Sequence, residues 1–204
     1  MISEVIRSSL IEFGFTDENI EDLNYFVKEL LIYNSKYNLI SKSTEKEIWF
    51  RHVLDSAQLV NIINFSNMDS MADLGTGGGF PGLVLSIFSK NKHFHVKMFE
   101  KSPIKVKFLN KINEELNLGC EVIEGNVEHT NIDSKYVVAR AFKKLSEILR
   151  ISREIMKKPH KIVILKGKSA QEEINKALKI VKFKYRLVKS ITDKESKIII
   201  IDAE

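Results

Sequence analysis

Met71-Ala-Asp-Leu-Gly-Thr-Gly-Gly-Gly-Phe-Pro-Gly-Leu-Val-Leu85 is the stretch that decides the fold. It joins a short apolar strand pattern, a glycine-dense turn and a helical pattern that begins at about Pro81. Gly75, Gly77 and Gly79 permit positive φ angles and a close approach of a ligand to the backbone, and proline suits a first helical turn. A turn without a ligand rarely needs so many glycines after a strand. We therefore expect a ligand at the C-terminal edge of this strand.

Strand and helix patterns alternate from Met71 onward. Strands are predicted at 71–74, 95–99, 121–123, 136–139 and 162–165, with helices from about 81, through 106–112, from about 145 and over 174–180. Such alternation predicts an α/β, Rossmann-like fold with a mostly parallel sheet. Two more strand patterns, 185–188 and 197–201, flank the polar turn Thr192-Asp-Lys-Glu and predict a closing antiparallel hairpin.

The segment before the turn has a helical pattern from residue 4 to about 62. Thr16 is predicted to cap a helix whose apolar stripe is Ile20, Leu23, Val27, Leu30 and Leu31. Thr44 and Glu47 are expected to form the capping box of the next helix, which carries Trp49, Val53, Ala57 and Val60. Because no long flexible linker follows, we expect residues 1–66 to pack as a helical extension on a core of residues 67–204.

Composition limits the class of protein. At 204 residues and 44% hydrophobic content, one main fold with an appended element is expected. The net charge of +5 favours polyanionic partners without requiring them. The single cysteine excludes an internal disulfide framework, and the absence of a signal-peptide pattern or a long apolar run predicts a cytoplasmic protein without a membrane span. The five histidines show no zinc-ligand spacing, so no metal site is expected.

Spacing alone leaves the cofactor open, because Gly77-x-Gly79-x-x-Gly82 also fits the dinucleotide pattern. Asp73 would repel a pyrophosphate but attract the ammonium or sulfonium of S-adenosylmethionine. Glu100 could accept hydrogen bonds from both ribose hydroxyls in either class. The acid at 73 therefore favours S-adenosylmethionine, and an NAD-type oxidoreductase is the alternative, made less favourable by the lack of a recognisable acid–base pair for hydride transfer.

Asp73-Leu-Gly-Thr-Gly-Gly-Gly-Phe-Pro-Gly82 resembles the RsmG (GidB) family of bacterial guanine-N7 methyltransferases of 16S ribosomal RNA. Further matching stretches follow in family order over roughly residues 20 to 175: Tyr37-Asn-Leu, Arg51-His-Val-Leu-Asp-Ser56, Lys105-Val-Lys-Phe-Leu109, Val127-Glu128, Ala139-Arg-Ala-Phe142 and Leu165-Lys-Gly167. The resemblance implies a class I S-adenosylmethionine-dependent methyltransferase acting on guanine N7 in 16S ribosomal RNA, within a small ribosomal subunit.

The resemblance also implies site residues. Gly75 and Phe80 would line the cofactor site, Val127 and Glu128 would flank the adenine, and Arg140 would lie on the methyl side as the catalytic residue facing the substrate. Asn126 and Lys135 depart from the family, where arginine and aspartate are common. A non-catalytic RNA-binding or assembly protein that keeps the fold is a second alternative.

Other predictions concern RNA contacts and the N-terminal motif. Lys166 and Lys143 follow the ends of predicted strands on the side of the cleft. Both are expected to bind RNA phosphates, and Lys166 is the stronger candidate. Arg51 and Asp55 are interpreted as an ordinary surface pair, and His52 as a structural residue. Guanine N7 carries an unprotonated lone pair, so the chemistry needs alignment rather than a general base. A monomer is expected, since no long heptad run is present.

Overall fold

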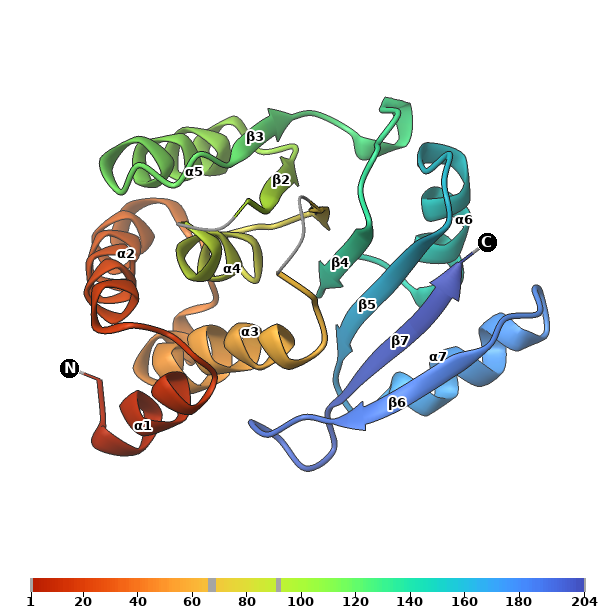
Figure 1. Ribbon diagram of the computed structural model, residues 1–204, viewed down its shortest axis with the longest axis horizontal. Helices are drawn as coiled ribbons and strands as arrows, with labels where there is room; N and C mark the ends of the chain where they lie inside the picture. Colours follow the sequence, from red (N-terminus) through yellow and green to blue (C-terminus); the bar gives the residue numbers. More distant parts are fainter. Residues whose placement is uncertain (1, 66–68, 91–92, 204) are drawn as a thin grey trace.

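The computed structural model of the chain describes residues 2–65, 69–90 and 93–203. Within these ranges seven strands form one sheet in the order β3-β2-β1-β4-β5-β7-β6, and β7 runs antiparallel to the other six strands (Figure 1). The strands are β1 (Ser70–Leu74), β2 (His95–Glu100), β3 (Glu121–Glu124), β4 (Tyr136–Arg140), β5 (His160–Lys166), β6 (Tyr185–Lys189) and β7 (Lys197–Ala203). The predicted mostly parallel sheet with a C-terminal antiparallel hairpin is confirmed.

Helices cover both faces of this sheet. The α-helices are α1 (Glu4–Glu12), α2 (Asp17–Tyr37), α3 (Asp55–Ala57), α4 (Gly82–Ser89), α5 (Pro103–Glu115), α6 (Leu145–Ile155) and α7 (Ala170–Leu178). Shorter helical turns are η1 (Lys42–Glu47), η2 (Trp49–Leu54), η3 (Gln58–Asn61) and η4 (Val127–His129). None of the helices described is long and apolar enough to cross a membrane.

Side chains alternate along each strand between two hydrophobic cores. On β4, Tyr136 and Val138 enter the core beneath α1 to α5, whereas Val137 and Ala139 enter the core beneath α6 and α7. The same alternation fixes where polar side chains at the strand ends point. Arg140 has the parity of Val138 and so emerges on the side of the N-terminal helices.

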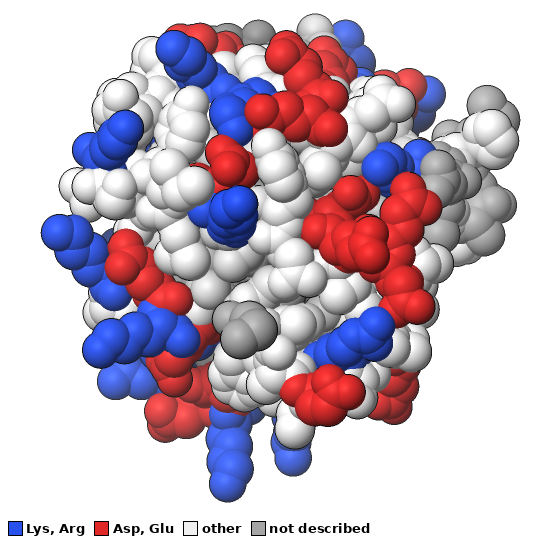
Figure 2. Space-filling model, turned by 90° about the vertical axis from the view of Figure 1, so that its left-hand side faces the viewer, with Lys and Arg blue, Asp and Glu red and all other residues white. Residues whose placement is uncertain are grey.

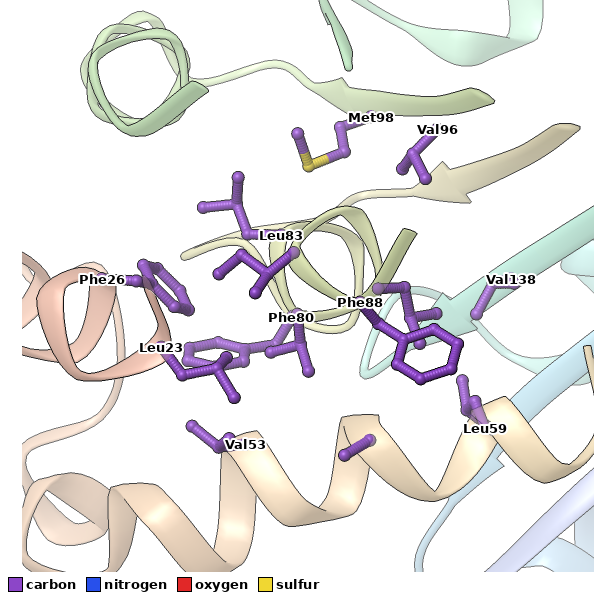
Figure 3. Packing of buried hydrophobic residues seen from close by; sticks show 14 of the residues in the cluster. Leu23, Phe26, Val53, Leu59, Phe80, Leu83, Phe88, Val96, Met98 and Val138 are labelled. Carbon is purple, nitrogen blue, oxygen red and sulfur yellow. The ribbon is translucent and has the colours of Figure 1, made fainter. Parts of the chain in front are cut away.

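The N-terminal helices share a hydrophobic core with the sheet rather than forming a separate one. Leu23 and Phe26 of α2 and Val53 of η2 lie near Phe80 and Leu83 (Figure 3). The Phe26 and Phe80 ring centroids are 5.2 Å apart. The boundary predicted between residues 66 and 67 lies outside the described residues, so the division at that point stays a prediction.

Local details of the N-terminal region differ from the sequence-based expectation. Thr16 does cap α2, accepting a hydrogen bond from the Asn19 amide, but Leu31 at the end of the predicted stripe is 37% exposed. Thr44 does not begin a helix in a capping box, because its hydroxyl donates to the Ser41 carbonyl within the 3₁₀ turn η1. The helix that follows is a π-helix over Trp49–Leu54 that continues as α3 and η3.

Candidate active site

A cavity of about 490 Å³ opens at the C-terminal edge of β1, β2 and β4. Its walls come from the glycine turn after β1, the end of β2, the loop after β3 and the segment after β4, with Leu39, Ile40 and His52 from the N-terminal region. This volume lies within the range of about 300–1,000 Å³ that is typical of small-molecule sites. The cavity is therefore where the sequence predicts a ligand.

The glycine turn presents backbone to this cavity. Gly75 has a φ of +70°, and a Cβ there would lie 2.3 Å from Cδ2 of Phe142, so any side chain would displace that ring. Gly77 has a φ of +63°, and the atom nearest to a Cβ there would be the Gly75 carbonyl oxygen at 3.9 Å. The missing side chain at Gly75 therefore allows the Phe142 ring to pack against the backbone, and the missing side chain at Gly77 leaves room for a ligand beside the turn.

Glu100 ends β2 and lines the same cavity while only 7% exposed. Its Oε2 accepts a hydrogen bond from the Gly77 amide and its Oε1 accepts one from the Ser102 amide, each at 2.9 Å. Each carboxylate oxygen keeps a further lone pair. Glu100 thus fixes the glycine turn and can still accept hydrogen bonds from a ligand such as a ribose.

Asp73 corrects one prediction. Its side chain has the parity of Met71 and points beneath the turn toward α4, where it is fully buried and Oδ2 accepts a 2.8 Å hydrogen bond from the Gly82 amide. Asp73 is not among the residues that line the cavity. Burial raises the pKa of the carboxyl from 3.8 to about 6. Asp73 therefore anchors the first turn of α4 and does not contribute to the surface of the cavity.

Val127 and Glu128, which are predicted to flank the adenine, and Phe80, which is predicted to line the cofactor site, all line the cavity. Val127 and Phe80 are 3% and 2% exposed, whereas the Glu128 carboxylate lies 3.4 Å from the ammonium of Lys143 and 3.5 Å from the guanidinium of Arg150. Partial burial opposes ionisation of Glu128, but these two cations lower its pKa overall. The two ion pairs hold Glu128, in the loop after β3, against Lys143 and Arg150, which follow β4 in the chain.

The two departures from the family lie in different places. Asn126 lines the cavity, and its side chain accepts a hydrogen bond from the Glu128 amide, which caps η4. Lys135 precedes β4 at the opposite end from Arg140, and five residues of strand span about 16 Å at the usual rise. Lys135 is therefore remote from the cavity, and this departure from the family does not change its lining.

Arg140 is the centre of a polar network that the sequence did not predict. Its Nη2 donates to Nδ1 of His52 at 2.7 Å, and its Nη1 donates to the Arg51 carbonyl at 3.1 Å. Oδ2 of Asp55 lies 3.8 Å from Nη1. The Phe80 ring lies beneath the guanidinium, 5.2 Å from its centre. The Arg140 and Asp55 side chains are each 17% exposed.

The interpretation of Arg51 and Asp55 as a surface pair is therefore wrong. The Arg51 guanidinium lies 3.6 Å from Glu47 instead. Asp55 is directed inward and accepts hydrogen bonds from Thr192 and Ser190, in the turn between β6 and β7. The π-helical turn of η2 changes which residues share a face, so α-helical spacing does not apply here.

The contacts of His52 determine its tautomer. Arginine can only donate, so Nδ1 accepts, and the proton lies on Nε2, which is 2.8 Å from the Thr44 hydroxyl. That hydroxyl in turn donates to the Ser41 carbonyl. Burial, together with the charges of Arg140 and Arg51, lowers the pKa of His52 from 6.5 to about 3. The ring is neutral at physiological pH.

Lys166 also differs from its prediction. It has the parity of Ile164 and points toward α7, where its ammonium lies 2.9 Å from Glu173 and donates to the Lys143 carbonyl. Its side chain is 11% exposed, so it is an internal ion pair rather than a free phosphate-binding lysine. Lys143 is 32% exposed and lines the first cavity, so its expected RNA contact stays a prediction.

A second cavity of about 390 Å³ adjoins the first, and His52, Arg140 and Ala141 line both. Ala141 has a φ of +50°, an unusual conformation for a residue with a Cβ, at the point where the chain passes between the two cavities. Ser190, Ser196 and Lys197 from the C-terminal hairpin complete the outer wall, and Lys166 and Glu173 lie on the inner side. In the part of the chain that is described, no group of three or more acidic, histidine or cysteine residues could hold a metal ion.

Comparison with known proteins agrees with this geometry. A model of the GidB family, described as rRNA small subunit methyltransferase G, matches residues 19–200. The chain is 36% identical over 197 residues to ribosomal RNA small subunit methyltransferase G of Orientia tsutsugamushi strain Ikeda, covering 96% of both chains. The corresponding protein of Pelagibacter ubique is 34% identical over 184 residues, covering 88% of this chain and 86% of the relative. The chain belongs to the GidB family.

Solved structures support the fold of this family member. A SAM-dependent methyltransferase from Aquifex aeolicus superimposes with a TM-score of 0.61 at 13% identity, covering 83% of this chain and 97% of that one. An RNA methyltransferase from Salinibacter ruber, solved with S-adenosyl-L-homocysteine, gives a TM-score of 0.55 at 16% identity, covering 73% and 90%. Family and fold together confirm an S-adenosylmethionine-dependent methyltransferase and decide against the NAD-type oxidoreductase.

Proposed function

We propose that this GidB family member transfers a methyl group from S-adenosylmethionine to N7 of a guanine in 16S ribosomal RNA. The observation that carries the proposal is the position of Arg140 at the boundary of two adjoining cavities. One cavity has the features of a nucleoside site, and the other is polar and opens beside it. A donor and an acceptor held on either side of this boundary would meet near the guanidinium.

The first cavity suits S-adenosylmethionine. The glycine turn leaves space beside Gly77, Glu100 retains acceptor capacity for ribose hydroxyls, and Val127 offers an apolar contact for a base. Phe80 and Phe142 add aromatic surface to the lining. The carboxylate of Asp73, buried beneath the turn, contributes an attraction for a cation without contact.

The residues around the boundary perform alignment rather than proton transfer. S-adenosylmethionine supplies an electrophilic methyl group on a sulfonium, and guanine N7 needs no deprotonation before attack. His52 is neutral, and both ring nitrogens are already hydrogen-bonded, so it is not arranged as a base. Arg140 has donors beyond those in its two hydrogen bonds, and we assign it the role of holding the guanine O6 or a phosphate while N7 faces the methyl group.

Basic side chains around the cavity mouths are suited to RNA phosphates. Lys101, Lys105 and Lys143 line the first cavity, and Arg51 and Lys197 line the second. By contrast, the face over α1, α2 and α5 shows basic and acidic side chains interspersed, without a continuous basic area (Figure 2). The cavity edge is therefore the favoured RNA surface, with the small ribosomal subunit as the proposed acceptor. One chain builds both cavities, which favours action as a monomer.

Replacing Arg140 tests this assignment. Arg140→Ala should lower methyl transfer to small ribosomal subunits by at least about 100-fold, an effect of the size seen when one transition-state donor is removed. The dissociation constant for S-adenosylmethionine should stay within a few-fold of the wild-type value. Loss of cofactor binding in Arg140→Ala would instead place Arg140 in the cofactor site.

The salt dependence of RNA binding tests the basic side chains at the cavity mouths. The affinity for RNA should fall steeply as the salt concentration rises, and a salt-independent affinity would remove these lysines from the interface.

A further inference from the structure

We propose that the N-terminal extension supplies two positioning residues, His52 and Asp55, which hold the guanidinium of Arg140 at the boundary between the two cavities. This inference rests on the proposed function, because it explains how Arg140 is held for that reaction. It assigns a role in the active site to a segment outside the Rossmann-like core.

The contacts of Arg140 support this role. Both of its hydrogen bonds, and its closest carboxylate, come from the segment between residues 51 and 55. β4 alone fixes only the Cα position and the direction in which the side chain leaves the strand. A long arginine side chain has many rotamers, so its end must be fixed by partners elsewhere.

His52 is itself held in place, which makes it a suitable partner. The Thr44 hydroxyl oxygen accepts a hydrogen bond from Nε2–H, so Nδ1 remains an acceptor directed at Arg140. The imidazole ring packs on the Phe80 ring, with the centroids 4.9 Å apart. The guanidinium lies over the same Phe80 ring. Arg140 and His52 therefore both pack on the Phe80 ring and are joined to each other by a hydrogen bond.

Asp55 links this network to the second cavity. Its Oδ1 accepts hydrogen bonds from Thr192 and Ser190, while Oδ2 lies toward the Arg140 guanidinium. Gln58, from η3, donates to Oδ1 of Asp55 as well. One carboxylate thus holds the turn between β6 and β7, which forms the cavity wall, and faces Arg140 with its other oxygen. A shift of Asp55 would therefore change the position of the Arg140 guanidinium and of the β6–β7 turn in the wall of the second cavity at the same time.

Variants of His52 separate positioning from packing. In His52→Asn, the short amide can accept near the position of Nδ1, whereas in His52→Gln the amide lies near the position of Nε2 and leaves Arg140 without its acceptor. We expect kcat to fall on the order of 10- to 100-fold in His52→Gln, the factor for losing a hydrogen bond to a charged group. His52→Asn should recover most of that loss. In both variants the dissociation constant for S-adenosylmethionine should stay within about threefold.

Matched controls come from the same chain. His160→Gln removes another buried histidine, which bonds to Ser152 away from the cavities. Asp22→Asn is compared with Asp55→Asn, because Asp22 also lies in the N-terminal extension, is 14% exposed and pairs with Lys90 at 3.0 Å. We expect the controls to lower the melting temperature without changing kcat, and Asp55→Asn to lower kcat about tenfold or more, as for a lost contact with a charged group.

A readout without turnover makes the test independent of the proposed function. In ¹⁵N NMR spectra, a guanidinium held by two partners gives slowly rotating, separately resolved Nη signals, and loss of these signals in Arg140→Lys identifies them. His52→Gln and Asp55→Asn should collapse them, and the controls should not. Unchanged signals with unchanged kcat in both variants would overturn the positioning role. Equal loss of kcat in His52→Asn, His52→Gln and His160→Gln would show packing alone. Absence of transfer by the wild type would refute the proposed function while the NMR comparison still decides this inference.

Discussion

Replacing Asp73 by asparagine should change how the free energy of unfolding depends on pH, and the size of that change follows from the pKa of Asp73. The folded protein raises the pKa of this buried carboxyl from 3.8 to about 6, because burial disfavours its charge. The folded state therefore binds a proton more tightly than the unfolded state does. Stability that is present below pH 3.8 is lost as the pH rises through 6, by about 3 kcal/mol in total, since a tenfold change in proton affinity corresponds to about 1.4 kcal/mol.

The pH dependence isolates this contribution from other effects of the substitution. By the same relation, ionisation costs the wild type about 1 kcal/mol at about pH 4.5 and about 3 kcal/mol at about pH 7.5. Asparagine keeps an acceptor for the Gly82 amide but does not ionise. The stability of Asp73→Asn relative to the wild type should therefore rise by about 2 kcal/mol between these pH values, measured by urea unfolding. Other titrating groups are common to both proteins and cancel.

A difference that does not vary with pH would refute this reasoning, because it would mean that Asp73 titrates alike in the folded and unfolded states. A difference that varies in the opposite direction would mean that the folded protein stabilises the carboxylate. Cofactor binding to Asp73→Asn gives a second measure. The dissociation constant should rise only modestly, since the side chain acts through charge without contact.

Three further predictions concern the same site. Gly77→Ala should weaken S-adenosylmethionine binding about tenfold or more in calorimetry, because the added methyl group would take up space beside the turn that the cofactor needs. The protein should stay folded, because the atom nearest to the Cβ would be the Gly75 carbonyl oxygen at 3.9 Å and the positive φ costs only about 1–2 kcal/mol. Glu100→Gln should weaken binding by a similar factor, since an amide cannot accept from both the Gly77 and Ser102 amides; unchanged affinity would remove Glu100 from the site. His52 has a pKa of about 3 when folded and 6.5 when unfolded, so below pH 6.5 the unfolded state alone takes up its proton. That group should cost about 1.4 kcal/mol of stability per pH unit on acidification, a slope that urea titrations of His52→Asn should lack.

The sheet and the place of the site could be predicted because local patterns determine both. The strand–turn–helix at 71–85 places a ligand site at a strand end wherever the remaining strands pair, and the alternation after it requires a parallel sheet. By contrast, the directions of Arg140 and Lys166 could not be predicted, because their strands are apolar on both faces. Only the pairing of Val138 with Val163 and of Ala139 with Ile164 shows that the two side chains leave the sheet on opposite sides.

The network around Arg140 could not be predicted in the same way. Its partners lie almost 90 residues away in the chain, and their faces depend on a π-helical turn that has no simple sequence signal. α-Helical spacing predicts a pair between Asp55 and Arg51, whereas tertiary contacts direct Asp55 to Arg140 and Thr192. The position of Asp73 before the first glycine predicts a place beside the cofactor, whereas strand alternation directs its side chain beneath α4.

The most direct test of the central claim is to map the methyl group that this protein adds. Small ribosomal subunits that lack the modification are incubated with the protein and labelled S-adenosylmethionine, and the ribosomal RNA is reduced with borohydride and cleaved with aniline, which breaks the chain at N7-methylguanosine. The account predicts that the wild type puts label into the ribosomal RNA and creates one new cleavage site, at a guanine. It predicts neither label nor cleavage with Arg140→Ala, although that variant still binds the cofactor. Label at another base or atom, or no transfer to ribosomal RNA by a protein that binds the cofactor, would contradict it.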